Sequence, residues 1–254
     1  MIKLEHVSLK YPLMQHNSHS LRAHVGHAFN RVLGKDTSTR PPIVKYIDAL
    51  QDINLSLSAS SRVGVIGCNG AGKTTLLRVI SGIYPPSSGT IKLVGKVSAL
   101  TDFTLGMDEN LTGIKNIICR LIYMGFTYKE VKEHIPSIVE FSGLGEKINM
   151  PLYTYSTGMF LRLAFSISTH FRPEILVLDE IIGAGDEAFR EKALRRTEKL
   201  LENSKIVVLS SHDLGAIEKY CTSAIFLDKG KIIFSGTPKE VTSEYKKFSK
   251  IYAK

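Results

Sequence analysis

One eight-residue segment constrains the fold of this chain more than any other feature. Residues 67–74 read GCNGAGKT, a full match to the pattern GxxxxGK(S/T). A short apolar run at 62–66 precedes it as a predicted strand, and a helix is predicted at 73–81. Glycines let consecutive backbone N–H groups curl around phosphate oxygens, and a helix N-terminus adds partial positive charge. The alternative is a glycine-rich turn without a ligand, which the full match between a strand and a helix disfavours.

Two side chains of this segment carry the expected chemistry. Lys73 reaches the β- and γ-phosphates of a nucleotide, and the Thr74 hydroxyl is a ligand of Mg²⁺. The residues expected to contact the nucleotide here are Gly67, Asn69, Gly70, Ala71, Gly72, Lys73, Thr74 and Thr75.

A second segment supplies the acids that hydrolysis requires. Residues 175–178 are four consecutive apolar residues, typical of a buried parallel strand, and Asp179 and Glu180 follow directly. Asp179 is expected to hold Mg²⁺ directly or through water, and Glu180 to polarise a water for attack on the γ-phosphate. A strand that ends in two acids is usually structural. Together with the phosphate loop, it predicts an enzyme that hydrolyses a nucleoside triphosphate.

The composition is typical of a globular protein. The 254 residues are 43% hydrophobic and 22% charged, with a mean hydropathy of +0.02. No apolar run approaches the roughly 18 residues that span a bilayer, and residues 1–11 lack the apolar stretch of a signal peptide. Three widely spaced cysteines indicate free thiols in a reducing compartment. We therefore expect a cytoplasmic location.

The net charge of +9 is carried by the two ends of the chain. Residues 1–50 have seven basic and three acidic side chains, and residues 229–254 have seven and two. Residues 51–228 are neutral, with 19 of each sign. A basic protein is typical of a partner such as nucleic acid or an anionic membrane surface.

Apolar strands alternate with helices along the chain, which predicts an α/β sheet. The predicted strands are 2–9, 53–57, 62–66, 90–94, 97–100, 175–178, 206–209, 224–228 and 231–235. The predicted helices are 73–81, 112–124, 127–142, 157–170, 187–202, 213–221 and 238–252.

Two segments are expected as insertions into this sheet. The helical block at about 112–170 forms one subdomain, with a kink at Pro136. The other insertion, at about 13–46, contains an amphipathic helix at 21–33. Its four histidines have no Cys or carboxylate at ligand spacing, so they are interpreted as surface residues in preference to a metal site.

Residues 153–159, YTYSTGM, lie between the two halves of the site and open a predicted helix. They resemble the LSGGQ-type signature of ATP-binding cassette (ABC) ATPases, with Ser156 and Gly158 kept; alone, the segment is equally a helix cap. The resemblance implies a RecA-like core sheet with an antiparallel β subdomain and an inserted helical subdomain. It also implies ATP as the nucleotide and a head-to-tail dimer, because the signature closes over the γ-phosphate of the other copy.

Three further positions match that family, and a fourth departs from its pattern. Tyr11 stands where the family places an aromatic ring against adenine, although a Tyr–Pro turn is the alternative. His212, after the strand 206–209, matches the switch histidine at the γ-phosphate, the alternative being a capping turn. Asp186 matches the acid of the D-loop. The fourth, Asp102, stands near the position of a family glutamine that contacts Mg²⁺; no glutamine is present there, and Asp102 is the expected substitute as a Mg²⁺ ligand.

Three local segments resemble one subfamily, the ATPases of polysaccharide exporters. They are NLTGIKNI at 110–117, YSTGMFLRLAFSI at 155–167 and GAGDEAFREK at 183–192. The resemblance implies one ABC ATPase domain over residues 1–254, without a carbohydrate-binding domain at the C-terminus.

The implied function is export of a lipid-linked polysaccharide, foremost O-antigen, across the bacterial inner membrane through a separate permease present in two copies. Capsule or teichoic-acid export is an alternative. A soluble cassette acting on nucleic acid or ribosomes and an inactive regulatory cassette are less favoured. We expect a peripheral protein on the cytoplasmic face of the inner membrane that contacts anionic lipid, chiefly through residues 21–33, and binds no nucleic acid.

Overall fold

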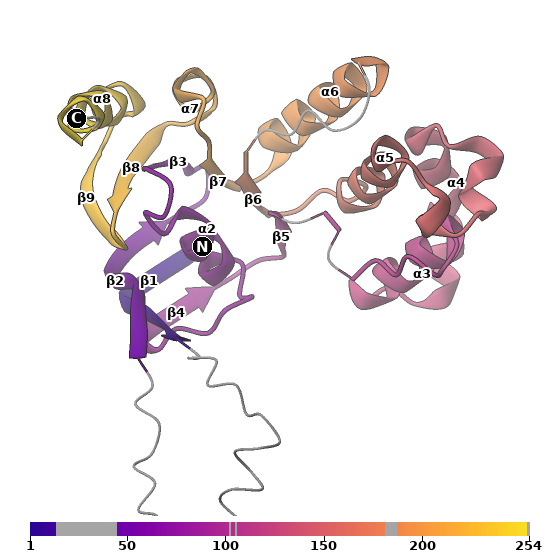
Figure 1. Ribbon diagram of the computed structural model, residues 1–254, viewed down its shortest axis with the longest axis horizontal. Helices are drawn as coiled ribbons and strands as arrows, with labels where there is room; N and C mark the ends of the chain where they lie inside the picture. The colour runs from indigo at the N-terminus through magenta and orange to yellow at the C-terminus, as the bar shows by residue number, and fades with distance from the viewer. Residues whose placement is uncertain (14–44, 102, 105, 181–186, 253–254) are drawn as a thin grey trace, which may run out of the picture.

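The computed structural model describes residues 1–13, 45–101, 103–104, 106–180 and 187–252 (Figure 1). It confirms the predicted α/β fold with two sheets and a helical subdomain. The larger sheet has six strands in the order β5-β6-β7-β3-β8-β9, and the smaller has three in the order β2-β1-β4. Among the described residues, no helix is both long and apolar enough to cross a membrane.

The larger sheet is parallel except for its last strand. Its strands are β3 (Arg62–Ile66), β5 (Val97–Leu100), β6 (Ile175–Asp179), β7 (Ile206–Ser210), β8 (Ser223–Asp228) and β9 (Lys231–Gly236). The inner strands are almost wholly buried, as continuous apolar runs require. Asp179 pairs with Ser210 across β6 and β7, so the carboxyl ends of these strands meet at one edge of the sheet.

The smaller sheet is built on a long hairpin of β1 (Ile2–Leu13) and β2 (Lys45–Leu57), with β4 (Ser88–Leu93) on its other side. Both hairpin strands extend beyond the predicted ranges, and Leu13 pairs with Lys45 at their end. The predicted insertion at 13–46 therefore joins two paired strand residues. Its predicted helix at 21–33 and its histidines lie outside the described residues.

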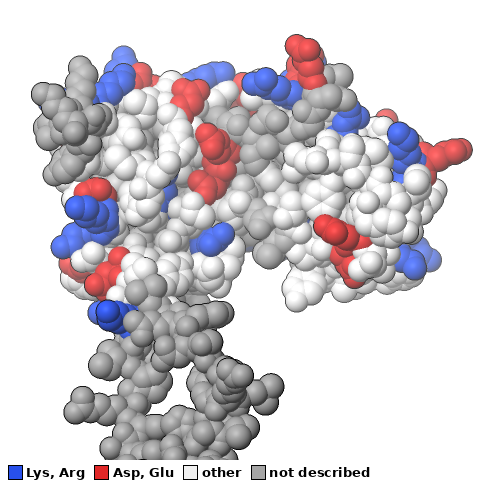
Figure 2. Space-filling view, in the orientation of Figure 1, with Lys and Arg blue, Asp and Glu red and all other residues white. Residues whose placement is uncertain are grey.

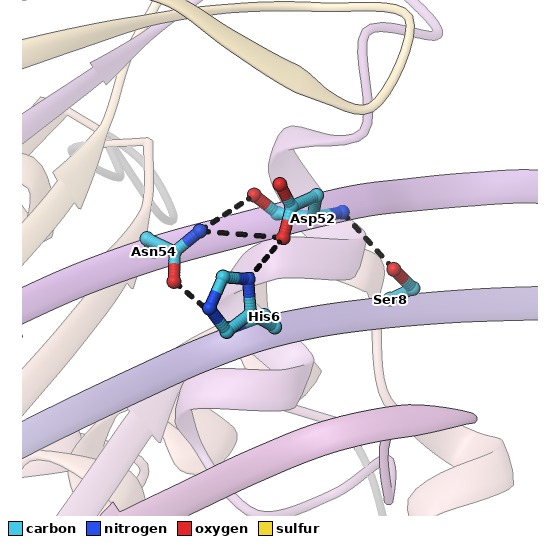
Figure 3. A network of polar contacts seen from close by, with 4 residues as sticks. All are labelled: His6, Ser8, Asp52 and Asn54. Carbon is cyan, nitrogen blue, oxygen red and sulfur yellow. Dashed lines mark hydrogen bonds and ion pairs between the residues drawn. The ribbon is translucent and has the colours of Figure 1, made fainter.

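Irregular pairing in this hairpin is held by side chains (Figure 3). His6 and Asp52 both have positive φ, 52° and 51°. The Nδ1 atom of His6 lies 2.7 Å from Oδ1 of Asp52, and the backbone N–H of Asp52 donates to Ser8 Oγ at 3.0 Å. The backbone N–H of His6 donates to Asn54 Oδ1 at 2.9 Å. Because these groups are exposed, they fix the local backbone more than they add stability.

Helices cover both faces of the larger sheet. Helix α2 (Lys73–Ile80) contacts one face, and α6 (Glu187–Asn203), α7 (Leu214–Tyr220) and α8 (Pro238–Tyr252) pack on the other. The first buried cluster includes Phe165 and Phe226 and lies between the sheet and α5–α8. The second includes Ile53 and Leu77 and joins the two sheets through α2.

The helical subdomain has a core of its own, and Figure 1 shows it to one side of the sheets. It contains α3 (Gly113–Tyr123), α4 (Tyr128–Ser142), α5 (Thr157–Ser168) and two short 3-10 helices, Gly145–Asn149 and Leu152–Thr154. Thr112, Thr127 and Ser156 cap the three α-helices through their hydroxyl oxygens. Helix α4 runs through Pro136 without ending there.

Asn116 holds the segment that leads into this subdomain. Its side chain is 1% exposed, and its Oδ1 accepts a hydrogen bond from the backbone N–H of Asp108 at 2.8 Å. Its Nδ2 donates to the carbonyls of Asp108, Leu111 and Thr112 at 3.0–3.2 Å. One buried amide therefore pairs with four backbone groups of the turn before α3.

We predict that Asn116→Ala lowers the free energy of unfolding by about 2–3 kcal/mol, because it removes the hydrogen bonds of a buried amide, among them the one that pairs the N–H of Asp108. Urea denaturation followed by circular dichroism measures the change. The control is Asn110→Ala, an exposed asparagine of the same segment, for which we expect a change within about 0.5 kcal/mol. Equal effects of the two substitutions would contradict the structural role of Asn116.

Candidate functional site

A cleft of about 720 Å³ lies at the carboxyl edge of the larger sheet, where that sheet meets the β1–β2 hairpin. It brings together residues of the β1–β2 hairpin, of the phosphate loop with the start of α2, and of the loops at the ends of β5, β6, β7 and β8. The residues that line it are Tyr11, Ile47, Asp48, Ala49, Gln51, Asn69, Gly70, Gly72, Lys73, Thr74, Thr75, Thr101, Asp179, Glu180, Ser210, Ser211, His212, Lys229 and Gly230.

The phosphate loop is packed so tightly that glycine is required at two positions. A Cβ on Gly67 would lie 2.3 Å from the carbonyl oxygen of Leu227. Gly72 has a φ of 103°, and a Cβ there would lie 2.8 Å from the carbonyl oxygen of Ala49. Gly72 is also the N-cap of α2, and no side chain caps that helix. The N–H groups of its first turn are therefore left to a ligand, as an anion site requires.

Lys73 extends back across this loop. Its Nζ donates to the carbonyl oxygens of Gly67 at 2.7 Å and Cys68 at 3.0 Å, and the residue is 8% exposed. Burial lowers the pKa of Lys73, and the nearby Asp179 carboxylate partly offsets that shift. The Lys73 ammonium group is therefore held at the loop, where phosphate oxygens would replace the two carbonyl oxygens as its hydrogen-bond partners.

Thr74 and Asp179 meet although they are far apart in the sequence. The Thr74 hydroxyl donates to Oδ2 of Asp179 at 2.7 Å, which joins the start of α2 to the end of β6. A hydroxyl and a carboxylate oxygen beside a phosphate site are the donor set that Mg²⁺ takes in proteins, so the residues fit that ion. Thr101 lines the cleft, whereas the predicted ligand Asp102 lies outside the described residues.

Glu180 follows β6 with an unusual backbone. Its φ is 75°, and its N–H donates to the carbonyl of Ser210 at 2.7 Å. A left-handed conformation at a residue other than glycine costs about 1–3 kcal/mol and is concentrated at functional sites. It turns the chain at the strand end, so that Glu180 lines the cleft beside Asp179.

His212 also lines the cleft, on the loop after β7. The capping alternative belongs to its neighbour, since Asp213 Oδ1 accepts the backbone N–H of Gly215 at 2.9 Å and caps α7. The N–H of Asp213 in turn donates to Ser211 Oγ at 3.0 Å. The local hydrogen bonds thus occupy the residues on either side of His212.

The opposite wall of the cleft contains the predicted adenine contact. Tyr11 lines it, with its ring edge-to-face against Tyr84 at a centroid distance of 5.9 Å. Gln51 and the Lys229–Gly230 turn also line the cleft, and the sequence analysis did not place them in the site. The N–H of Gln51 donates to the carbonyl of Gly230 at 2.8 Å, and the N–H of Gly230 to the carbonyl of Ala71 at 2.9 Å. A turn signal marks Gly230 in the sequence, but its docking against the phosphate loop is a tertiary contact.

Ser156 and Gly158 do not line this cleft. Ser156 Oγ accepts the N–H of Met159 at 3.2 Å, so the residue caps α5. Both residues face a separate hollow of about 420 Å³, together with Lys147 and Arg162. Asp186, predicted to belong to the same composite site, lies outside the described residues.

Comparison with known sequences identifies relatives along the chain. The ABC transporter family model matches residues 50–183. The O-antigen export system ATP-binding protein RfbE of Yersinia enterocolitica is 40% identical over 228 residues, which cover 90% of this chain and 94% of that protein. RfbB of Myxococcus xanthus, named likewise, is 44% identical over 79% of this chain, and the Bacillus anthracis teichoic acids export ATP-binding protein TagH is 36% identical over 99%. The chain spans less than half of these last two proteins, 46% and 43%.

Solved structures agree on the fold. The dimeric ATP-binding cassette MJ0796 in a post-hydrolysis state, bound to ADP and Pi, superposes with a TM-score of 0.67 at 20% identity. The superposition covers 94% of this chain and 99% of the cassette. Fold and sequence together show that this chain belongs to the ABC transporter family.

Proposed function

We propose that this chain hydrolyses ATP to drive export of a lipid-linked polysaccharide, foremost O-antigen, through a separate membrane permease. One observation carries the proposal: the phosphate loop, the Thr74–Asp179 pair and Glu180 converge in a single cleft. The names of the relatives support the export process. RfbE, which matches over nearly its whole length, belongs to an O-antigen export system, and TagH makes teichoic-acid export the second candidate.

Each residue of the cleft has a different role in the proposed hydrolysis. The N–H groups of the phosphate loop and the Lys73 ammonium bind the β- and γ-phosphates, with Tyr11 against the adenine ring. Thr74 and Asp179 would hold Mg²⁺, which neutralises phosphate charge when bound. Glu180 accepts a proton from the water that attacks the γ-phosphate in line, and His212 contacts that phosphate from the end of β7.

A second copy of the chain completes the site in this scheme. Ser156 and Gly158 lie at the N-terminus of α5 and outside the chain's own cleft. In a head-to-tail pair, the start of α5 would face the γ-phosphate held by the partner, and Ser156 would donate to it. The permease and the anionic inner leaflet are the remaining partners, which places the protein at the cytoplasmic face of the inner membrane.

The distribution of charge supports a membrane partner in preference to nucleic acid. The excess of basic residues lies at the two ends of the sequence, while residues 51–228 are neutral. On the face that Figure 2 shows, Lys and Arg side chains are dispersed among Asp and Glu side chains. A nucleic-acid groove would instead need a continuous basic stripe.

Glu180→Gln tests the proposed general base. We expect ATP turnover to fall at least about 100-fold, because glutamine cannot accept a proton, while ATP binding persists and the dimer accumulates. Phosphate release measures turnover, and sedimentation in the presence of ATP measures the dimer. The matched control is Glu133→Gln on the exposed side of α4, for which turnover should be unchanged. Normal turnover in the Glu180 variant would exclude it as the base.

Ser156→Asp tests the composite site without removing the helix cap, because aspartate caps as well as serine. We expect normal thermal stability but almost no turnover, since the added carboxylate would face the γ-phosphate. An equimolar mixture with Lys73→Ala should then recover about a quarter of the wild-type rate, because half of randomly paired dimers contain one intact site out of two. Failure of the mixture to exceed the two single variants would contradict action across the dimer.

Export is tested in the source bacterium. Replacing the chromosomal copy with the Glu180→Gln variant should remove the polysaccharide from the cell surface and leave its lipid-linked form inside the cell, whereas Glu133→Gln should preserve export. Composition analysis of the retained glycan separates O-antigen from teichoic acid. Detergent extraction should recover a permease with the wild-type protein. Association with ribosomes or RNA instead, with surface polysaccharide intact, would contradict the export role.

A further inference from the structure

A second polar cavity lies between α6 and the end of the helical subdomain. Its volume is about 490 Å³, and it shares no lining residue with the nucleotide cleft. We name it the basic hollow, and its lining residues are Phe141, Thr169, His170, Arg172, Glu191, Lys192, Arg195, Arg196, Lys199 and Leu200.

Positive charge dominates this hollow. Among the described lining residues there are five cations, Arg172, Lys192, Arg195, Arg196 and Lys199, and one carboxylate, Glu191. Five minus one leaves an excess of four positive charges. The carboxylate is already engaged, because Glu191 forms an ion pair with Arg195 at 2.5 Å. No described carboxylate forms an ion pair with any of the other four.

The sequence of α6 places these cations unfavourably for a helix on its own. Lys192 and Arg196 are four residues apart, as are Arg195 and Lys199. Like charges at this spacing lie on neighbouring turns and destabilise a helix. A negatively charged ligand on this face would reverse that repulsion.

Arg196 gives the clearest indication of what the hollow accepts. Its guanidinium carbon lies 3.4 Å from the ring centre of Phe141, so the ring covers one face of the group. Partial burial lowers the pKa of Arg196. It forms no hydrogen bond with a described residue, and no described side-chain nitrogen is buried without a partner. Its N–H groups therefore reach the hollow, where they are held in place and free to bind an anion.

A second cation, Lys192, is also held in position. Lys192 donates to the carbonyl of Phe141 at 3.0 Å, which joins α6 to the end of α4. His170 contacts His134 at 3.1 Å, and burial lowers the pKa of His170 to about 4. That side chain is therefore neutral near pH 7. The hollow is therefore lined by side chains of α6 and of the helical subdomain, and it is not a row of lysines along a free helix.

We propose that the basic hollow binds a multiply charged phosphate group, such as a diphosphate. A single carboxylate would offset one of four uncompensated charges, whereas a diphosphate offsets most of them. Arginine guanidinium groups bind phosphate oxygens in pairs, and Arg172 and Arg196 reach the hollow from different elements. The volume lies within the range of small-ligand sites. A bound diphosphate would join α6, which begins seven positions after Glu180, to the helical subdomain.

Hydrogen exchange measured by mass spectrometry tests the site directly. Saturating MgADP first fills the nucleotide cleft, so that added inorganic pyrophosphate reports on other sites. We expect pyrophosphate to slow exchange in peptides covering 168–172 and 187–200. The double variant Arg172→Gln/Lys199→Gln, which changes two exposed side chains, should weaken that protection at least about tenfold, as loss of charged hydrogen bonds implies.

A matched control has the same change of charge elsewhere. Arg190→Gln/Lys115→Gln alters one exposed residue of α6 that does not line the hollow and one of α3, and it should leave the protection unchanged. Vesicles of phosphatidylglycerol, compared with phosphatidylcholine, form a second arm. Protection by pyrophosphate supports a multiply charged phosphate ligand, whereas protection by phosphatidylglycerol alone, whose phosphodiester carries one negative charge, would overturn the proposal. Protection by neither probe, or protection equal in both double variants, would overturn the proposal.

Discussion

The close contact between the phosphate loop and its neighbours is the constraint on which the rest of the site depends. Gly67 lies against the carbonyl of Leu227, and Gly72 lies against the carbonyl of Ala49. These contacts press the loop between β8 and the β1–β2 hairpin. The same packing lets the N–H of Gly230 reach the carbonyl of Ala71. The smaller sheet is therefore part of the nucleotide site, because it forms the wall that fixes the loop.

The parallel register of the larger sheet determines what that loop faces. Since β6 and β7 pair with Asp179 opposite Ser210, their carboxyl ends deliver acidic and polar groups to the same edge. The hydrogen bond from Glu180 to Ser210 then turns the chain out of the strand. Thr74 reaches Asp179 only because α2 starts at this edge. The register of the strands therefore brings the phosphate loop and the two acids into one site. No single segment of the sequence specifies that register.

Sequence reasoning succeeded where a function is encoded in one continuous segment. The phosphate loop and the strand ending at Asp179 each combine residue type with local geometry. It missed the Lys229–Gly230 turn and Gln51, because their place in the cleft depends on docking of separate elements. It also ended β1 too early: alternation of apolar and polar residues stops near residue 9, whereas pairing with β2 continues to Leu13. Where a strand pair continues beyond the buried part of its sheet, its residues need not alternate between apolar and polar, so the sequence pattern does not indicate the pairing.

The basic hollow is another feature that could not be predicted from a single segment of the sequence. Along α6 the residues Lys192, Arg195 and Lys199 read as a solvated helix face, which is how most charged helical segments are disposed. Only the fold brings Phe141 and Arg172 to that face, and with them a wall and a further cation from outside the helix. Charge counted along the chain located the excess at its ends and found residues 51–228 neutral. A segment with no net charge can still form a strongly positive surface site. The fold brings basic residues together that alternate with acidic residues along the sequence.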